Sequence, residues 1–307
     1  MPEVTVRDAQ GGDAALISEV SSAAVPYLVR STEQVAADLR KDRRLGRQRW
    51  VATVGEDLVG TATSRRVAEH DGEREVLVSV EVHPSFGSRG VGTALLLTAA
   101  GAVPGATLLE ASSRDDPVSM AFAVRNGFLP EGEHEMVFVD PATVPDAGPE
   151  PHGLRSTTLD ALPDLGMLLE THNLAAQHDP ARLVRRLTMY QLRSEWWDDP
   201  DNATDLSFGL LAPGRTGPVL AAFTSVRVDR ARGRSRSSLT LTHPDHRGLG
   251  LELWVRQRML NALAAAGIGA SWTGYVGPET PLRTVDEALG YRPAGHEVQV
   301  QRRLPPV

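Results

Sequence analysis

A strand, a proline, a glycine-rich turn and a helix occur in the same order twice in this chain. The first copy runs from an alternating strand at 76–83 through Pro84 into glycines within 87–92. The second runs from a strand at 237–243 through Pro244 into glycines at 248–250. One glycine turn also suits loops that bind nothing, whereas a repeat within matching elements indicates a duplicated domain.

The surrounding hydrophobic patterns predict the same elements in each half. They predict strands at 4–7, 50–54, 58–65, 76–83, 107–111 and 133–139, with helices starting near 13, 92 and 118. In the second half they predict strands at 206–211, 219–226, 237–243, 268–275 and 297–303, with helices at 162–170, 251–266 and 282–288. We therefore expect an α/β (α+β) fold of two tandem domains, each a mixed, mostly antiparallel sheet flanked by helices.

Composition sets the expected domain boundaries. Residues 141–151 hold four prolines and Gly148, which is typical of a linker. The predicted domains are residues 1–140 and 152–307, and the polar segment 191–205 reads as an insertion in the second.

Charge and cysteine content narrow the function classes. The chain has no cysteine, so it has no disulfide framework and no thiolate nucleophile or metal ligand. A net charge of −7 disfavours nucleic acid as a partner and favours cationic small molecules. The N-terminus shows no leader pattern, and the apolar stretch near 95–103 is shorter than the roughly 20 residues that span a bilayer. We expect a cytoplasmic protein, a monomer or homodimer, with no membrane partner.

The turn between strand and helix suits a bulky anion. The first turn of a helix carries unpaired N–H groups and the positive end of the helix dipole. Glycines let the backbone approach a diphosphate closely, and Arg89 adds a charged donor.

With these motifs, both halves resemble the GCN5-related N-acetyltransferase (GNAT) superfamily, whose motif is a strand, Val-x-Pro and then Arg/Gln-x-x-Gly-x-Gly/Ala. The resemblance extends to the later helices that end at Gly127-Phe128 and Gly290-Tyr291. It covers nearly the whole chain, in the tandem arrangement similar to mycothiol synthase and antibiotic N-acyltransferases.

The resemblance implies acetyl-CoA as co-substrate. In the first half, the pantetheine arm would pair with the strand at Val80 and Val82. The diphosphate would then lie on Ser88, Arg89, Gly90, Val91, Gly92 and Thr93. The corresponding residues of the second half are Thr242, Arg247, Gly248, Leu249, Gly250 and Leu251.

Both copies depart from the motif. Gly87 stands at the leading Arg/Gln position of the first. Glu252 stands at the last small position of the second, where a carboxylate would repel a diphosphate at the helix N-terminus. The first half is therefore the preferred CoA site.

Amine acetylation needs a base for the ammonium group and is aided by an acid for the thiolate. Glu110, in a strand that is otherwise buried, and Glu81, on the opposite face from Val80 and Val82, are the candidate bases. Each has a structural alternative, an ion pair for Glu110 and a solvent-facing position for Glu81. The family's tyrosine acid is absent, since Ala123 and Asp286 stand at its two positions. Ser119 and Tyr275 are the substitutes that the sequence offers.

Candidate acceptor residues are Tyr27 after the first helix, Trp196, Trp197 and Asp198 in the inserted segment, and Tyr275. Core packing, or anchoring of the insertion, is the alternative for the aromatic ones. His172, His178 and Asp179 lack the spacing of helical zinc ligands, so we expect no metal. The sequence predicts an N-acetyltransferase acting on a small-molecule amine. A mycothiol-synthase-like acetylation of a cysteinyl amino sugar, or a non-catalytic CoA-binding sensor or interaction module, are the alternatives.

Overall fold

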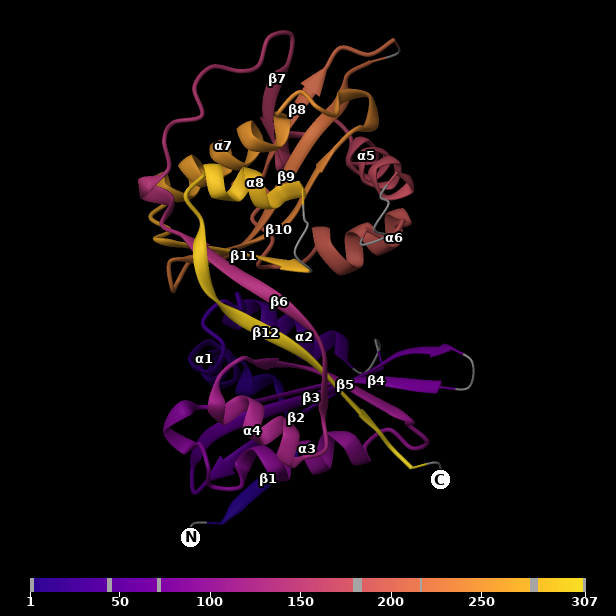
Figure 1. Cartoon of the computed structure of the whole chain (residues 1–307), viewed down its shortest axis with the longest axis vertical. Coiled ribbons are helices and arrows are strands. Elements are labelled where there is room, and N and C mark those ends of the chain that lie inside the picture. Colours follow the sequence, from indigo (N-terminus) through magenta and orange to yellow (C-terminus); the bar gives the residue numbers. More distant parts are fainter. Residues whose placement is uncertain are drawn as a thin grey trace. The chain divides into compact units, whose positions relative to one another are not determined.

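The computed structural model describes residues 3–42, 46–70, 73–178, 184–215, 217–276 and 281–305. The chain divides into two compact units. The first comprises Met1–Met136, Gly274–Pro278 and Ala294–Val307, and the second comprises Val137–Thr273 and Glu279–Pro293. Each unit is a mixed sheet with helices on both faces, which confirms the expected α/β class (Figure 1).

The first unit takes its elements mostly from the first half of the chain. They are β1 (Val4–Asp8), α1 (Ala14–Ala24), α2 (Thr32–Lys41), β2 (Arg47–Val54), β3 (Asp57–His70), β4 (Glu73–Val82), α3 (Val91–Gly101), β5 (Leu108–Arg114), α4 (Pro117–Arg125), most of β6 (Leu129–Val139) and most of β12 (Arg292–Arg303). Strands β1 to β4 pair antiparallel in chain order, β4 pairs parallel with β5, and β5 pairs antiparallel with β12.

The second unit repeats this order. Its elements are β7 (Arg155–Thr158), α5 (Leu165–Gln177), α6 (Met189–Leu192), β8 (Phe208–Ala212), β9 (Val219–Asp229), β10 (Arg234–Thr242), α7 (Leu251–Ala265), β11 (Ala270–Val276) and α8 (Pro281–Ala288). Strands β7 to β10 pair antiparallel and β10 pairs parallel with β11. The duplication inferred from the sequence is thus visible strand by strand.

The end of the chain differs from the expected boundary at 152–307. Strand β12 pairs with β5 from Glu297↔Arg114 to Arg303↔Leu108, so it belongs to the sheet of the first unit. The expected linker, in turn, lies in the second unit along α7. There Asn261 Oδ1 accepts from the amide of Ala147, and Trp254 Nε1 donates to the carbonyl of Pro149.

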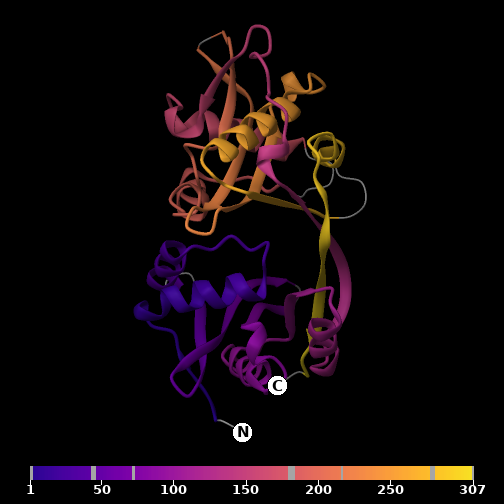
Figure 2. The same cartoon turned by 90° about the vertical axis from the view of Figure 1, so that its left-hand side faces the viewer.

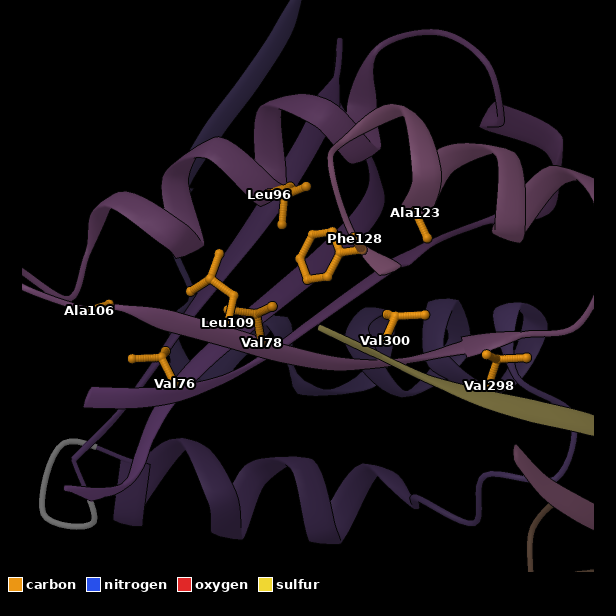
Figure 3. Packing of buried hydrophobic residues seen from close by; sticks show 9 residues of the cluster. All are labelled: Val76, Val78, Leu96, Ala106, Leu109, Ala123, Phe128, Val298 and Val300. Atoms are coloured by element: carbon orange, nitrogen blue, oxygen red, sulfur yellow. The ribbon is translucent and has the colours of Figure 1, made fainter. Parts of the chain in front are cut away.

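Opposite faces of the first sheet carry different helices. Figures 1 and 2 show α3 and α4 on one face and α1 and α2 on the other. Figure 3 shows the core under α3 and α4, where Leu96 and Phe128 pack on alternate residues of three strands, with Leu109 and Val300 among them. Because side chains alternate along a strand, the strand residues between these core positions face α1 and α2.

Helix α2 was not among the predicted elements. It begins after Ser31, whose Oγ accepts from the amide of Gln34 at 3.1 Å, and its amphipathic sequence carries Val35 into the core. A serine followed three residues later by glutamine is a helix-start signal. Val35 and Ala37 are its buried apolar residues, and Ala36 and Leu39 are only partly buried, so the periodic pattern is weak.

Candidate functional site

Strands β4 and β5 are paired for only part of their length. Their parallel register runs from Glu75↔Leu108 to Leu77↔Glu110, and no later pair is found in the described residues. Beyond it, β4 stays paired with β3 up to Val82, and β5 stays paired with β12 up to Arg114. The two strands therefore diverge from residue 78 and from residue 111 onward. Each presents an edge to which an extended chain can add by backbone hydrogen bonds.

A helix with a bare N-terminus follows the diverging end of β4. After the single turn at Pro84–Phe86, Gly90 caps α3 with φ of 83° and no side-chain hydrogen bond to the first turn. Ala94 is the first residue whose amide bonds back, to the carbonyl of Gly90 at 3.0 Å. The amides before it thus lack helical partners, and at Gly90 an added Cβ would meet nothing within 4 Å. This is an open, positively polarised end that suits a diphosphate.

Two side chains shape this loop. Ser88 has a φ of 59°, in the left-handed region. The corresponding residue of the second loop is Gly248, with a φ of 75°. Arg89 lies with its guanidinium 5.1 Å from the ring centre of Phe86 and is exposed, so it can reach an anion at the loop. Gly92, in the first turn, lies against Phe122 of α4, whose ring would be 3.1 Å from an added Cβ.

The second loop repeats the geometry but not the chemistry. Its turn at Pro244–His246 leads to Gly250, which caps α7 with φ of 70°. Glu252 occupies the place of Gly92, the second residue of the helix, and adds a negative charge to the first turn. Arg247 donates to the backbone carbonyl of His178 at 3.3 Å.

The interior beneath the second loop is also different. Arg256 and Leu96 are each the sixth residue of their helix, while Asp286 and Ala123 each lie four residues before the closing glycine. Leu96 and Ala123 belong to an apolar core, whereas Arg256 and Asp286 form an ion pair of 2.7 Å.

This ion pair contacts the part of β10 that lies beyond its pairing with β11. Their parallel register ends at Arg236↔Trp272, as far as the described residues show. Arg256 also donates to Thr240 of β10 at 3.4 Å and lies 5.5 Å from the ring centre of Tyr291. Asp286, the residue that the sequence comparison set at the tyrosine position of the second half, is engaged in this buried ion pair.

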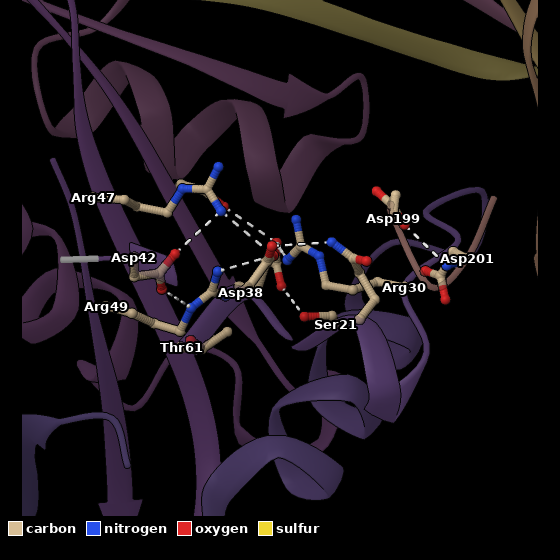
Figure 4. A network of polar contacts seen from close by, with 12 residues as sticks. Ser21, Arg30, Asp38, Asp42, Arg47, Arg49, Thr61, Asp199 and Asp201 are labelled. Carbon is tan, nitrogen blue, oxygen red and sulfur yellow. Dashed lines mark hydrogen bonds and ion pairs between the residues drawn. The ribbon is translucent and has the colours of Figure 1, made fainter. Parts of the chain in front are cut away.

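Glu81 lies on the α1 side of the first sheet and is 8 % exposed. Ser21 and Ser79 both donate to its carboxylate, Ser79 at 3.2 Å, and Arg30 forms an ion pair with it at 3.3 Å. Figure 4 shows Ser21 and Arg30 in this polar network. The corresponding next-to-last residue of β10 is Leu241, which packs in an apolar core.

The network continues into β2 and α2. Arg49 donates to Asp42 at 3.0 Å, and Arg47 forms ion pairs with Asp42 and Asp38 at 3.2 and 3.4 Å (Figure 4). Burial is the main cause that lowers the pKa of Arg49, followed by the nearby Arg30, while Asp42 and Asp38 oppose the shift. These charges fix the α1–α2 face of the first unit.

Glu110 is the last residue of β5 that pairs with β4, so it stands at the vertex of the divergence. It is half-buried on the face opposite Leu109, and Gln301 of β12 donates to its Oε1 at 3.1 Å. Burial raises the pKa of the Glu110 carboxyl, and the neighbouring Glu75 raises it further, while the Gln301 hydrogen bond lowers it. A carboxylate with these surroundings gains basicity.

The predicted acceptor residues are dispersed. Tyr27 is buried after α1 in the first unit, and Tyr275 is buried in β11. The ring centre of Trp196 lies 6.2 Å from that of Phe223 and 6.3 Å from that of Trp197, and both tryptophans pack against the core of the second unit. Asp198 is exposed and directly follows the short helix Arg193–Trp197.

Two other candidates serve local structure. Ser119 donates to Asp116 at 2.8 Å within the cap of α4. Nδ1 of His172 lies 3.4 Å from Oδ1 of Asn173, and Asp179 lies outside the described residues. No group of three acidic or histidine side chains that could hold a metal is found in the described part of the chain. No described helix is long and apolar enough to cross a membrane.

Three residues of the site were missed from the sequence. Ser21 and Arg30 contact Glu81 from 60 and 51 residues away, and Gln301 contacts Glu110 across 191 residues. The only sequence signal is the alternation of polar residues with Val298 and Val300, which puts Gln301 on the polar face of its strand.

Comparisons with known proteins agree with this geometry. Residues 18–128 match the model of the acetyltransferase (GNAT) family. The fold is similar to a tandem GNAT protein from the clavulanic acid biosynthesis pathway, with a TM-score of 0.72, 20 % identity and coverage of 99 % of this chain and 100 % of that one.

Two further structures share the fold. A GCN5-related N-acetyltransferase from Sphaerobacter thermophilus has a TM-score of 0.66 and 16 % identity, covering 99 % of this chain and 97 % of its own. A glucosamine N-acetyltransferase region of a fungal β-N-acetylglucosaminidase has a TM-score of 0.61 and 14 % identity, covering 98 % of this chain and 38 % of its own. No curated protein matches the sequence. Residues 18–128 thus match the acetyltransferase (GNAT) family, and the fold of the chain as a whole is similar to that of a tandem GNAT protein.

Proposed function

We propose that the first unit transfers an acetyl group from acetyl-CoA to the amine of a small molecule. The observation that carries the proposal is the divergence of β4 and β5 after Leu77 and Glu110, next to the bare N-terminus of α3. The family match at 18–128 spans all of these elements. Family membership supports acyl transfer in general, and the acetyl donor and amine acceptor are our inference.

The residues present fit acetyl-CoA. The edge of β4 at Val80 and Val82 would pair with the pantetheine amides, as an added strand does. The uncapped amides at Val91, Gly92 and Thr93, with the open backbone at Gly90, would hold the diphosphate, and exposed Arg89 would add charge. Ser88 holds the turn that presents these amides.

Glu110 is the base that the geometry favours. In the reaction, the amine nitrogen bonds to the thioester carbonyl carbon, the carbon–sulfur bond breaks, and CoA leaves as thiol. The ammonium proton must be removed first, directly or through water. Glu110 has one neutral donor and a raised pKa, whereas Glu81 is buried under Arg30 and two serines. A strand amide near Val82 would stabilise the developing oxyanion.

The second unit would support the first without binding CoA by the same means. Glu252 at its helix start and the buried Arg256–Asp286 pair beneath it both oppose an active second site. One CoA per chain is the expected stoichiometry. The acceptor is expected to be cationic, given the net charge of −7.

Thiol release tests the proposal. The purified chain, acetyl-CoA and a panel of amines, with diamines, amino sugars and a cysteinyl amino sugar among them, should release CoA thiol only when an accepted amine is present. Mass spectrometry should detect the N-acetyl product. Selective turnover of the cysteinyl amino sugar would support the mycothiol-synthase-like alternative. Tight CoA binding without turnover on any amine would support a CoA-binding sensor. Absence of CoA binding at millimolar concentration would exclude both the acetyltransferase and the sensor.

A further inference from the structure

The last strand of the chain supplies a side chain to the face of the first unit that holds Glu110. Val298 and Val300 of β12 point into the core under α3 and α4 (Figure 3). Strand alternation therefore directs Gln299 and Gln301 to the opposite face, on which Glu110 lies. Gln301 is paired directly with Glu110 in the register of β12 and β5.

Gln301 lies in a continuously paired part of β12. Its strand is paired with β5 without a register shift from Glu297 to Arg303, and the amide of Leu304 then donates to the carbonyl of Thr107 at 2.8 Å. Its Nε2 donates to Oε1 of Glu110 at 3.1 Å. Among the described residues, Oε2 of Glu110 accepts no hydrogen bond, so one oxygen is held and the other is available to a proton.

From this arrangement we propose that Gln301 is a positioning residue for the base Glu110, supplied to the first unit's reaction by the last strand of the chain. The inference rests on the proposed function. A neutral amide donor orients the carboxylate without neutralising it, unlike the Arg30 guanidinium at Glu81. Three influences thus act on one carboxyl: burial and Glu75 favour its protonated form, and Gln301 favours its ionised form.

The test is a pH series on three full-length variants, Gln301→Leu, Gln301→Glu and the control Gln299→Leu. Gln301→Leu removes the donor and keeps the approximate size, and Gln301→Glu replaces it with a second carboxyl group. At pH 7, Gln301→Leu should lower kcat by about tenfold, the factor that one lost hydrogen bond to a charged group represents. The KM for acetyl-CoA should stay unchanged, because Gln301 lies on the face opposite to α3.

The acidic limb of the kcat profile provides the decisive readout. Its midpoint should move to higher pH in Gln301→Leu, because the ionised form of Glu110 loses its donor, and further in Gln301→Glu, because like charges disfavour ionisation. A purely structural contact would not produce this order.

Gln299→Leu is the matched control. It breaks the neighbouring contact of the same strand pair, in which Gln299 donates to Ser112 at 2.7 Å, and it leaves Glu110 untouched. Its acidic midpoint should equal that of the wild type. Thermal melting should show that all three variants are folded.

The outcomes separate this inference from the function on which it rests. If Glu110→Gln keeps its kcat, Glu110 is not the base and the proposed mechanism fails. If Glu110→Gln is inactive while folded Gln301→Leu keeps the wild-type midpoint and kcat, the mechanism stands and the role of Gln301 is overturned. An equal shift in Gln299→Leu would also overturn it, because any strand contact would then suffice.

Discussion

Nη2 of Arg256 lies 2.7 Å from Oδ1 of Asp286 inside the second unit, with both side chains at most 2 % exposed. The first unit has Leu96 and Ala123 at the two equivalent positions. A buried ion pair stabilises little by itself, because desolvation offsets its attraction, but loss of one partner leaves an uncompensated charge.

The ion pair predicts a strongly non-additive pair of substitutions. Arg256→Leu and Asp286→Ala should each lower the free energy of unfolding by about 3–5 kcal/mol. The double variant, which copies the first unit, should lie within about 1–2 kcal/mol of the wild type. Urea unfolding measures all four proteins. Additive losses in the double variant would show that the two charges do not interact as described.

Charge at the first turn of α3 should decide CoA affinity. Gly92→Gln and Gly92→Glu must displace the same Phe122 ring, so any difference between them reports charge alone. We expect Gly92→Glu to bind CoA at least about tenfold more weakly than Gly92→Gln, because a carboxylate at the helix start repels the diphosphate. Titration calorimetry measures both, and equal affinities would place the diphosphate elsewhere.

The reverse change serves as the companion experiment. Glu252→Gly restores the motif in the second unit but leaves the buried Arg256–Asp286 pair. Calorimetry should still show one CoA per chain. A second binding event would mean that Glu252 alone closes the second site.

Glu110 should carry the acidic limb of the activity profile. Glu110→Gln should lower kcat by about 10²–10⁴-fold, the usual contribution of a general base. Wild-type activity should decline on acidification at a higher pH than for an ordinary glutamate, because burial and Glu75 raise its pKa. Stopped assays across pH 5–9 with saturating substrates measure this limb.

The same raised pKa has a consequence for stability. The folded state binds the Glu110 proton more tightly than the unfolded chain, so this stabilising contribution is full below the ordinary glutamate pKa of 4.5 and is lost as pH rises through the folded pKa. Glu110→Gln should therefore be more stable than the wild type at neutral pH, and the difference should vanish in acid. Thermal melts at several pH values test the sign, and a destabilised variant at neutral pH would contradict it.

Glu81 should behave in the opposite way. Glu81→Gln leaves the guanidinium of Arg30 without its partner and weakens the bonds from Ser21 and Ser79. We expect a loss of about 1–3 kcal/mol in stability, with kcat changed less than by Glu110→Gln. Thermal melting and steady-state kinetics of the same variant measure both effects. If Glu81→Gln melted like the wild type but lost kcat, Glu81 and not Glu110 would be the base.

The sequence located most of the elements near the proposed site. The alternation before Pro84, the glycines at 87–92 and the apolar helix after them are local signals, and α3 begins at Val91 as they predict. The repeat predicted two similar sets of strands, and the two units pair their strands in the same order. One helix that was missed, α2, has a capping serine but few fully buried apolar residues.

The pairing of distant strands could not be read from the sequence. The alternation at 297–303 predicts a strand but does not name its neighbour, and proximity in sequence assigned it to the second domain. In the structure it pairs with β5, where Val298 and Val300 complete the core of the first unit and Gln301 meets Glu110. Burial of Val298 and Val300 in a core made by the first half of the chain decided this, and no local pattern encodes it.

The sequence by itself determined that the chain holds two related domains with glycine-rich turns before a helix, because strand, turn and helix signals act over a few residues. Tertiary structure decided which charges surround each turn. Glu81 and Asp286 became ion-pair partners because Arg30 and Arg256 fold against them, while Glu110 received only a neutral donor. The role of a carboxylate depends on the charges and burial around it, and those are properties of the folded chain.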